Sequence, residues 1–142
     1  MSITMVLSLN GSEIGQIDNI LFTASMNVRQ AMEAAYGLTP GHTYNFSLQY
    51  FGSELGYEVV TLDSIANQVG SDPDSYIFWA LYVNGQLSPT GIDSTVLNDG
   101  DRIDWNYQAY SSEVHAGTRY EQMRNAARTL FSQSPRNYSE VV

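Results

Sequence analysis

The chain has 142 residues, of which 43% are hydrophobic and 15% charged, and its formal net charge is -9. This length and composition fit one packed domain and argue against disorder. The absence of cysteine excludes disulfides, thiolate nucleophiles and cysteine-ligated metals. No apolar run approaches the roughly 20 residues that span a bilayer. Residues 1–10 lack the features of a signal peptide, so we expect a cytoplasmic protein, unless the sequence is trimmed from a secreted or surface protein.

Acidic and basic residues are unevenly placed along the chain. Residues 1–117 carry 13 acidic residues against Arg29 and Arg102, a balance of -11, whereas residues 118–142 carry four arginines against two glutamates. An acidic body repels phosphate backbones, so we expect no nucleic-acid partner. The arginine-bearing tail is the one part of the chain that suits an anionic partner.

The chain begins with a predicted hairpin and helix. Residues 3–9 alternate apolar and polar side chains, Asn10-Gly11 suits a tight turn, and residues 14–22 return as a second strand. A helix is predicted over about 27–36, capped by Ser25 or Asn27. Its apolar residues recur at helical spacing: Val28, Ala31, Met32, Ala35 and Tyr36. Gly37 then suits the left-handed position after a helix, and Pro40 prevents continuation.

The middle of the chain predicts several strands. Residues 44–51 and 57–62 have strand patterns, residues 63–70 are ambiguous with a helical turn under Ile65, and residues 71–75 form a turn cluster. The most hydrophobic run is residues 76–83, which predicts a central strand covered on both faces. Asn84-Gly85 ends this strand in a turn, and residues 103–110 form the last strand.

The tail predicts a second helix, from a cap at Thr118 to about Phe131, with Glu121 completing a capping box. Its apolar stripe consists of Tyr120, Met123, Ala127 and Leu130. The order of elements predicts an α+β, mostly-β fold, a β-grasp-like sheet with one packed helix and an added C-terminal helix. We assign residues 1–112 to the domain and 113–142 to a helical extension with a loose tail. The extension could cover an edge strand, fill a cleft or mediate a homodimer.

No catalytic or metal-binding constellation stands out. His42 and His115 are the only histidines, and we expect both to be solvent-exposed because nothing in the sequence supports either as a ligand. Asp99, Asp101 and Asp104 lack the spacing of a calcium loop and fit a capped turn. The ten tyrosines, five phenylalanines and two tryptophans exceed the need of a small core. They favour an aromatic cleft that holds a ligand.

Three segments resemble the C-terminal domain of transcobalamin and intrinsic factor, and its bacterial relatives, a transcobalamin-like family of unknown function. They are Gly56 to Ile65, Tyr76 to Gly85 with its Val-Asn-Gly turn, and Leu97 to Trp105 with its Gly-Asp-x-Ile element. The resemblance covers about residues 3–110 and implies a β-grasp-like fold.

The resemblance also implies a binding site. The corrin contacts of the vitamin binders fall near Leu55, Trp79, Ala80 and the loop 86–88. The vitamin binders carry Trp where this chain has Leu55 and Gln where it has Ala80, and their large helical barrel is absent here. Adding two tyrosines, the expected ligand-binding residues are Leu55, Tyr57, Trp79, Ala80, Tyr82, Gln86, Leu87 and Ser88.

Three functions compete. The leading hypothesis is a non-catalytic small-molecule-binding module that requires no cofactor and holds a planar or amphiphilic metabolite in an aromatic cleft. Cobalamin or another corrinoid is one candidate ligand. The alternatives are a protein-interaction or self-association module, as a homodimer through the C-terminal helix, and a cyclase- or isomerase-type enzyme built on a binding scaffold.

Overall fold

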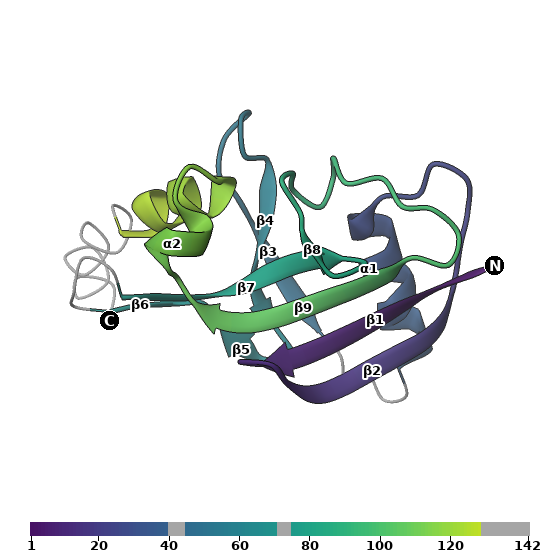
Figure 1. Cartoon of the computed structure of the whole chain (residues 1–142). Coiled ribbons are helices and arrows are strands. Elements are labelled where there is room, and N and C mark those ends of the chain that lie inside the picture. The colour runs from purple at the N-terminus through teal and green to yellow at the C-terminus, as the bar shows by residue number, and fades with distance from the viewer. Residues whose placement is uncertain (40–44, 71–74, 129–142) are drawn as a thin grey trace, which may run out of the picture.

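The computed structural model describes residues 1–39, 45–70 and 75–128 (Figure 1). Predictions for His42, Pro40, Tyr44, the turn cluster at 71–74 and the chain beyond residue 128 lie outside the described residues. The elements are β1 (Ser2–Leu9), β2 (Ser12–Leu21), α1 (Val28–Leu38), β3 (Phe46–Tyr50), β4 (Tyr57–Leu62), β5 (Ile65–Ala66), β6 (Gln68–Val69), β7 (Tyr76–Val83), β8 (Gln86–Leu87), β9 (Arg102–Ala109) and α2 (Ser112–His115). Residues 119–128 are also helical.

The larger sheet has the order β2-β1-β9-β7-β6, and β8 also pairs with β7. β1 and β9 run parallel, and the other neighbours are antiparallel. The strands β3, β4 and β5 form a second, antiparallel sheet. A first hairpin, one helix and a central parallel pairing of the first and last strands define a β-grasp-like sheet. The predicted fold class, α+β and mostly β, is therefore confirmed.

The N-terminal hairpin folds as its sequence predicts. Asn10 and Gly11 take φ values of 47° and 88°, which is the left-handed geometry of a tight hairpin turn. β1 buries Ile3, Met5 and Leu7, the apolar face of the predicted strand. α1 covers that face of the sheet (Figure 1).

α1 begins at a capping box. The Asn27 side chain accepts a hydrogen bond from the Gln30 backbone, and the Gln30 side chain accepts one from the Asn27 backbone. The prediction for Gly37 is wrong. α1 continues through it to Leu38, and Thr39 is the C-cap in extended geometry. The Thr39 hydroxyl and backbone N–H both donate to the Tyr36 carbonyl and so satisfy the helix end.

The main core lies between the larger sheet, α1 and the second sheet. Trp79 of β7 belongs to it, with its indole Nε1 donating to the Ile65 carbonyl at 2.8 Å. The helical turn considered for residues 63–70 is absent. Asp63 and Ser64 take φ values of 51° and 66°, so the chain reverses tightly from β4 into β5 and then enters β6.

β7 is covered on both faces, as its composition predicts. Trp79 and Leu81 face the main core, while Tyr76, Phe78 and Ala80 face the opposite side. There they join a second cluster with Tyr110, Tyr120 and Met123, the last two from helix 119–128. The C-terminal helix is therefore the second layer that an apolar central strand requires.

Side chains complete the edge of β7 in the gap between β6 and β8. The Trp79 backbone N–H donates to Asn67 Oδ1 at 3.1 Å, and the Leu81 N–H donates to Tyr120 Oη at 2.8 Å. A buried backbone donor without an acceptor would be costly, so these side chains stand in for a missing strand. Tyr120 thereby fastens the C-terminal helix to the sheet by a polar as well as an apolar contact.

Thr118 caps the C-terminal helix as predicted, since its hydroxyl accepts from the Tyr120 N–H. The predicted capping box is absent, because the Thr118 N–H donates to the His115 carbonyl and Glu121 accepts from the Tyr110 hydroxyl. His115 ends the short helix α2, and it is buried rather than exposed. It lies edge-on to Phe78, with Nδ1 accepting from the Ser111 N–H at 3.0 Å. Burial lowers the pKa of His115, so a neutral ring is favoured.

We expect Gly37→Ala to stabilise the protein by about 0.5–1 kcal/mol, because the residue is inside a helix and a Cβ there meets no atom within 4 Å. Urea denaturation measures the change. Gly85→Ala is the contrasting variant, since Gly85 has a φ of 83° that alanine adopts only under strain. A destabilising Gly37→Ala would contradict the helical placement of Gly37.

Tyr120→Phe should destabilise the protein by about 1–3 kcal/mol, because the Leu81 N–H and Arg119 Nη2 both lose an acceptor while the ring and its packing remain. Tyr50→Phe, at a side chain that is 56% exposed, is the matched control and should change stability by less than about 0.5 kcal/mol. Equal unfolding midpoints for the two variants would show that the hydrogen bonds accepted by the Tyr120 hydroxyl do not stabilise the protein.

Candidate ligand-binding cleft

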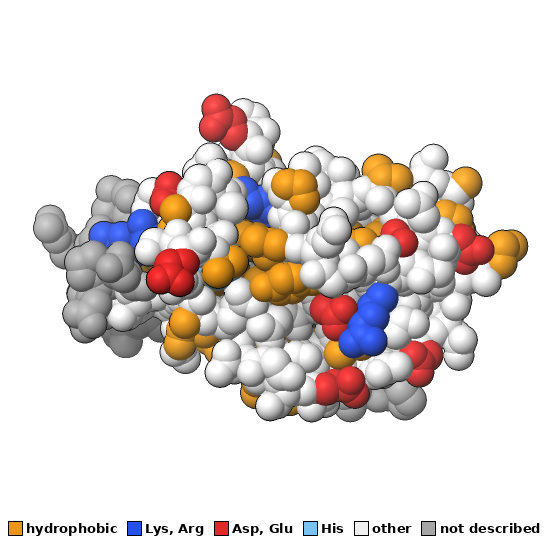
Figure 2. Space-filling view, in the orientation of Figure 1, with side chains coloured by type: hydrophobic (Ala, Val, Ile, Leu, Met, Phe, Trp, Pro, Cys, Tyr) orange, Lys and Arg blue, Asp and Glu red, His pale blue; other side chains and the backbone are white. Residues whose placement is uncertain are grey.

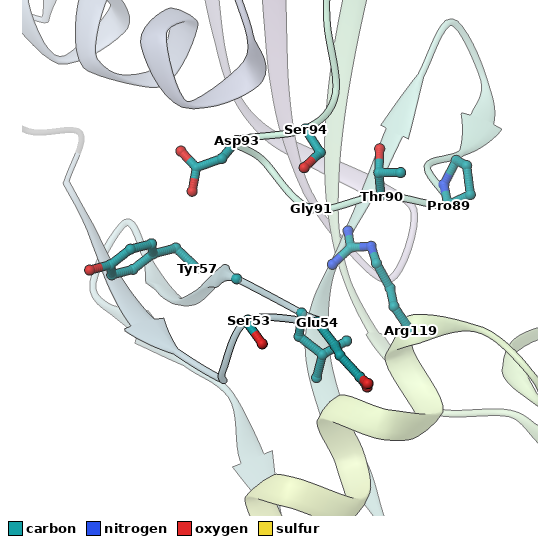
Figure 3. Close-up of a pocket in the computed structure, with 11 residues that line it drawn as sticks. Ser53, Glu54, Tyr57, Pro89, Thr90, Gly91, Asp93, Ser94 and Arg119 are labelled. Atoms are coloured by element: carbon teal, nitrogen blue, oxygen red, sulfur yellow. The ribbon is translucent and has the colours of Figure 1, made fainter.

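A cleft of about 160 Å³ lies where the β3–β4 connection, the loop after β8 and the C-terminal helix meet (Figure 3). Its lining residues are Ser53, Glu54, Leu55, Gly56, Tyr57, Pro89, Thr90, Gly91, Asp93, Ser94 and Arg119. The Arg119 side chain extends from the helix toward the Thr90–Gly91 backbone, and Tyr57 and Asp93 lie on the far side of the opening (Figure 3). Three parts of the chain that are distant in sequence thus build one hollow with both polar and apolar lining.

Both loops of the cleft are held by hydrogen bonds. In the β3–β4 connection, Phe51 N–H donates to the Gly56 carbonyl at 2.8 Å, and Gly52 and Gly56 take positive φ values. In the other loop, Thr95 Oγ1 lies 2.7 Å from Thr90 Oγ1 and 2.8 Å from the Gly91 carbonyl. The walls are therefore set before any ligand arrives, which limits the ordering entropy that binding must overcome.

Behind the cleft lies a buried ion pair between Glu58 of β4 and Arg119. Their side chains are 1% and 8% exposed, and Arg119 Nη1 donates to Glu58 Oε2. Arg119 Nη2 donates to Tyr120 Oη at 2.6 Å. A Cβ added at Gly91 would lie 2.9 Å from Glu58 Oε1 and 3.2 Å from the Leu55 carbonyl, so a larger residue there would have to displace the carboxylate. Burial of both charges makes this pair sensitive to the loss of either partner.

Burial makes the ionised form of Glu58 costly even beside Arg119. Burial raises the pKa of Glu58 to about 7, the charge and hydrogen bond of Arg119 oppose this rise, and the negative charge of Asp93 adds to it. Burial likewise raises the pKa of Tyr120 to about 12, so its hydroxyl stays neutral.

The rim of the cleft combines an aromatic ring with charges. Arg29 of α1 lies 3.4 Å from an Asp93 carboxylate oxygen, and its Cζ lies 4.9 Å from the centre of the Tyr57 ring. Tyr57 in turn contacts Tyr50 with ring centres 5.0 Å apart. Glu54 is exposed on the other side of the opening. The rim therefore offers a π face and carboxylates to a ligand.

An apolar surface adjoins the cleft. Leu55, Tyr82 and Leu87 are partly buried and pack against the second cluster beneath helix 119–128. Figure 2 shows hydrophobic side chains gathered over β7 and β8 beside the C-terminal helix. A neighbouring hollow of about 460 Å³ shares Pro89, Thr90 and Ser94 with the cleft. The cleft, an apolar strip and a second hollow thus lie side by side.

The structure brings most of the expected ligand-binding residues to this region. Leu55 and Tyr57 line the cleft. Gln86, Leu87 and Ser88 line the neighbouring hollow, and Tyr82, half-buried on the apolar strip, donates to Gln108 Oε1 at 3.0 Å.

Trp79 and Ala80 are the two expected contacts that the structure does not place there. Both are buried, at 1% and 0% exposure. Because successive residues of a strand face opposite sides, Trp79 points into the main core while Ala80 lies in the second cluster with Tyr120. The C-terminal helix thus occupies the surface at which Ala80 was expected to meet a ligand.

None of the charged residues at the site was among those expected from the sequence: they are Arg29, Glu54, Glu58, Asp93 and Arg119. A signal for Glu58 exists, since it is a lone acid in the apolar strand β4. Such a position demands a buried partner or a functional role. Nothing local in the sequence pairs it with Arg119, 61 residues away.

The described residues contain no group of three or more side chains suited to hold a metal ion. Across the same ranges, no helix is long and apolar enough to cross a membrane.

Comparisons with known proteins agree with this architecture. The chain is similar to a proposed metal-binding protein from Ruminococcus gnavus, with a TM-score of 0.54 and 14% identity, over 78% of this chain and 98% of that one. It is also similar to haptocorrin in complex with Cbi, with a TM-score of 0.58 and 16% identity. That match covers 78% of this chain and 25% of haptocorrin, so the similarity spans a quarter of that protein.

The fold is therefore similar to that of part of haptocorrin, and at the level of the fold the resemblance expected from the sequence is confirmed. Residues 47–109 match the model of a family described as a domain of unknown function, DUF4430. No curated protein matches the chain significantly.

We expect stability to fall with rising pH because of Glu58. Its pKa rises from 4.5 to about 7 on folding, so the folded chain holds a proton that the unfolded chain releases. The stabilisation is complete below pH 4.5 and is lost as the pH rises through about 7, by up to about 3 kcal/mol. Urea unfolding at about pH 5 and about pH 8 measures this loss.

Glu58→Gln is the control for this prediction, because the amide keeps the shape but cannot titrate. Its stability should change less between the two pH values than that of the unaltered protein. Parallel curves for the two proteins would show that Glu58 remains ionised throughout and that Arg119 outweighs its burial.

Proposed function

We propose that this protein is a non-catalytic small-molecule-binding module whose site is the cleft at residues 53–57 and 89–94 with the apolar strip beside it. The observation that carries the proposal is the meeting of three unlike surfaces at one place. The polar groups of the cleft, the Tyr57 ring and the strip of Leu55, Tyr82 and Leu87 lie together, and the loops of the cleft are held by their own hydrogen bonds. Amphiphilic ligands are bound by such combinations of apolar area and a few fixed polar groups.

The dimensions of the cleft define how a ligand would lie. A hollow of about 160 Å³ holds a substituent and not the whole of a drug-sized molecule, which needs about 300–1,000 Å³. The ligand would place one polar group in the cleft and rest its body on Leu55, Tyr82 and Leu87. The adjoining hollow of about 460 Å³, lined by Gln86 and Ser88, would take a second part of the same molecule.

A corrinoid is one candidate for such a ligand. Support comes from the fold of haptocorrin, which was solved with Cbi, and from the position of Leu55 and the 86–88 loop at the cleft and the adjoining hollow. Trp79 and Ala80 are unavailable because they are buried. The contact would therefore be with the edge of a corrinoid, through fewer residues than expected from the sequence.

Glu58 gives the enzyme hypothesis its one specific observation, a buried carboxylate with a raised pKa beside a cleft. Its geometry argues against acid–base catalysis. Oε2 accepts from Arg119, Oε1 lies against Gly91, and the side chain is 1% exposed. A general base must come within hydrogen-bond reach of the proton it removes, so we retain the binding function.

Calorimetric titration with cobinamide and a panel of planar, amphiphilic metabolites tests the proposal. We expect saturable binding of at least one class, and Leu55→Asp should weaken it by at least about tenfold because it places a charge on the apolar strip. Leu21→Asp is the matched control, since Leu21 is an exposed leucine of β2 and lines none of the hollows described here. Absence of binding across the panel, or equal weakening by the two variants, would overturn the proposed site.

A further inference from the structure

Three acidic residues lie at or behind the cleft, and all come from the segment that matches the family model: Glu54 and Asp93 line it, and Glu58 is buried behind it. Glu54 lies on the β3–β4 connection, Glu58 on β4 and Asp93 on the loop after β8. The surrounding chain adds to their negative potential, since residues 1–117 carry 13 acids against two arginines. Left to themselves, these carboxylates would attract a cation.

Two of these carboxylates are already paired with guanidinium groups, and both guanidinium groups come from outside the matched segment 47–109. Arg119 reaches in from the C-terminal helix to Glu58, and Arg29 reaches in from α1 to Asp93 and the Tyr57 ring. A carboxylate partner combined with an aromatic face is how proteins bind cationic ligands. The contacts of Arg119 and Arg29 thus indicate that the cleft region is suited to bind a guanidinium group.

The guanidinium of Arg119 is incompletely satisfied. Its Nη atoms donate to Glu58 and Tyr120, with a longer contact to Met123 Sδ, while its buried Nε has no acceptor among the described residues. Burial also raises the pKa of Glu58 in spite of Arg119. The buried Nε of Arg119 lacks an acceptor in the described part of the chain, and Arg119 does not fully offset the cost of burying the Glu58 carboxylate. A cation that satisfies these groups better can therefore replace Arg119 in this contact.

We propose that the cleft is a receptor for a cationic group, a guanidinium or primary ammonium, and that Arg119 occupies the innermost position of this receptor in cis. The inference rests on the proposed function, because it assigns the polar group of the ligand to the same cleft. The ligand would be either a small cationic metabolite or the arginine or lysine side chain of a peptide.

Release of Arg119 requires no unfolding of the helix. Tyr120 and Met123 are buried in the second cluster and hold the helix to the sheet, whereas Arg119 is the first residue of the helical segment. Its side chain can rotate out once its contacts with Glu58 and Tyr120 are replaced by those of an incoming cation. The acidic surroundings would receive the displaced charge.

Chemical rescue of Arg119→Ala tests the proposal. The variant leaves the carboxylates and a guanidinium-sized space, and ethylguanidinium in solution is the probe. We expect the probe to raise the melting temperature of Arg119→Ala saturably, by more than equal tetramethylammonium, which has no N–H donor. Arg124→Ala, which removes an arginine from the same helix but not from the cleft, should show no such rise. Should Arg119→Ala be unfolded alone, the same probe should restore its circular dichroism.

The double variant Glu58→Gln/Arg119→Ala isolates the carboxylate, and we expect it to lose the rescue. An equal response of the single and double variants, or no response of Arg119→Ala, would overturn the cation site.

A second measurement tests occupancy by Arg119 in the unaltered protein. Agmatine and a capped Gly-Arg-Gly peptide, followed through the amide resonances of Gly56 and Gly91, should bind at least about tenfold more weakly to the unaltered protein than to Arg119→Met. Tighter binding of agmatine would identify the natural ligand as a small cationic metabolite, and tighter binding of the peptide would identify it as a peptide side chain. Equal affinities of the two proteins would show that Arg119 does not compete. Cobinamide binding that persists while every guanidinium response fails would overturn this inference and leave the proposed function intact.

Discussion

The structure depends on the need to cover one strand on both sides. β7 is apolar along its whole length. Leaving the side chains of either face exposed to water would cost free energy, so both faces need a covering layer. α1 and the second sheet cover one side, and the C-terminal helix covers the other. The helix that seals the second face also brings Arg119 to the wall of the cleft. Packing of the core and composition of the site are therefore set by the same element.

Elements with a strong periodic pattern were predictable from the sequence. The hairpin, α1, β4, β7 and β9 follow directly from alternation, helical spacing and turn residues. Gly37 was misassigned because a glycine near a helix end suits both the last turn and the position after it, and only the tertiary contacts decide. Residues 63–70 form strands because Trp79 and Asn67 connect them to the sheet, a long-range effect that local pattern does not contain.

The proposed site was predictable only in part, and the residues that were not predicted are the charged ones. Residues carried by the resemblance, such as Leu55 and Leu87, line the proposed cleft and the adjoining hollow because they sit at fixed positions in a shared fold. Glu58, Asp93 and Arg119 meet through folding of distant segments, so their spacing in sequence has no meaning by itself. The burial of His115 also results from a contact between distant segments, because α2 folds back over Phe78. The local sequence therefore contains no sign that His115 is buried.

The parallel pairing of β1 with β9 has a consequence for how the protein is made. Thr4 pairs with Arg102, so the centre of the sheet joins segments from opposite ends of the domain. While a ribosome is still producing the middle of the chain, the first hairpin has an open edge and α1 has only part of its sheet to cover. Such non-local closure is slow and leaves strand edges exposed to neighbouring chains. Synthesis of this domain should therefore pass through an aggregation-sensitive interval that ends only when β9 inserts.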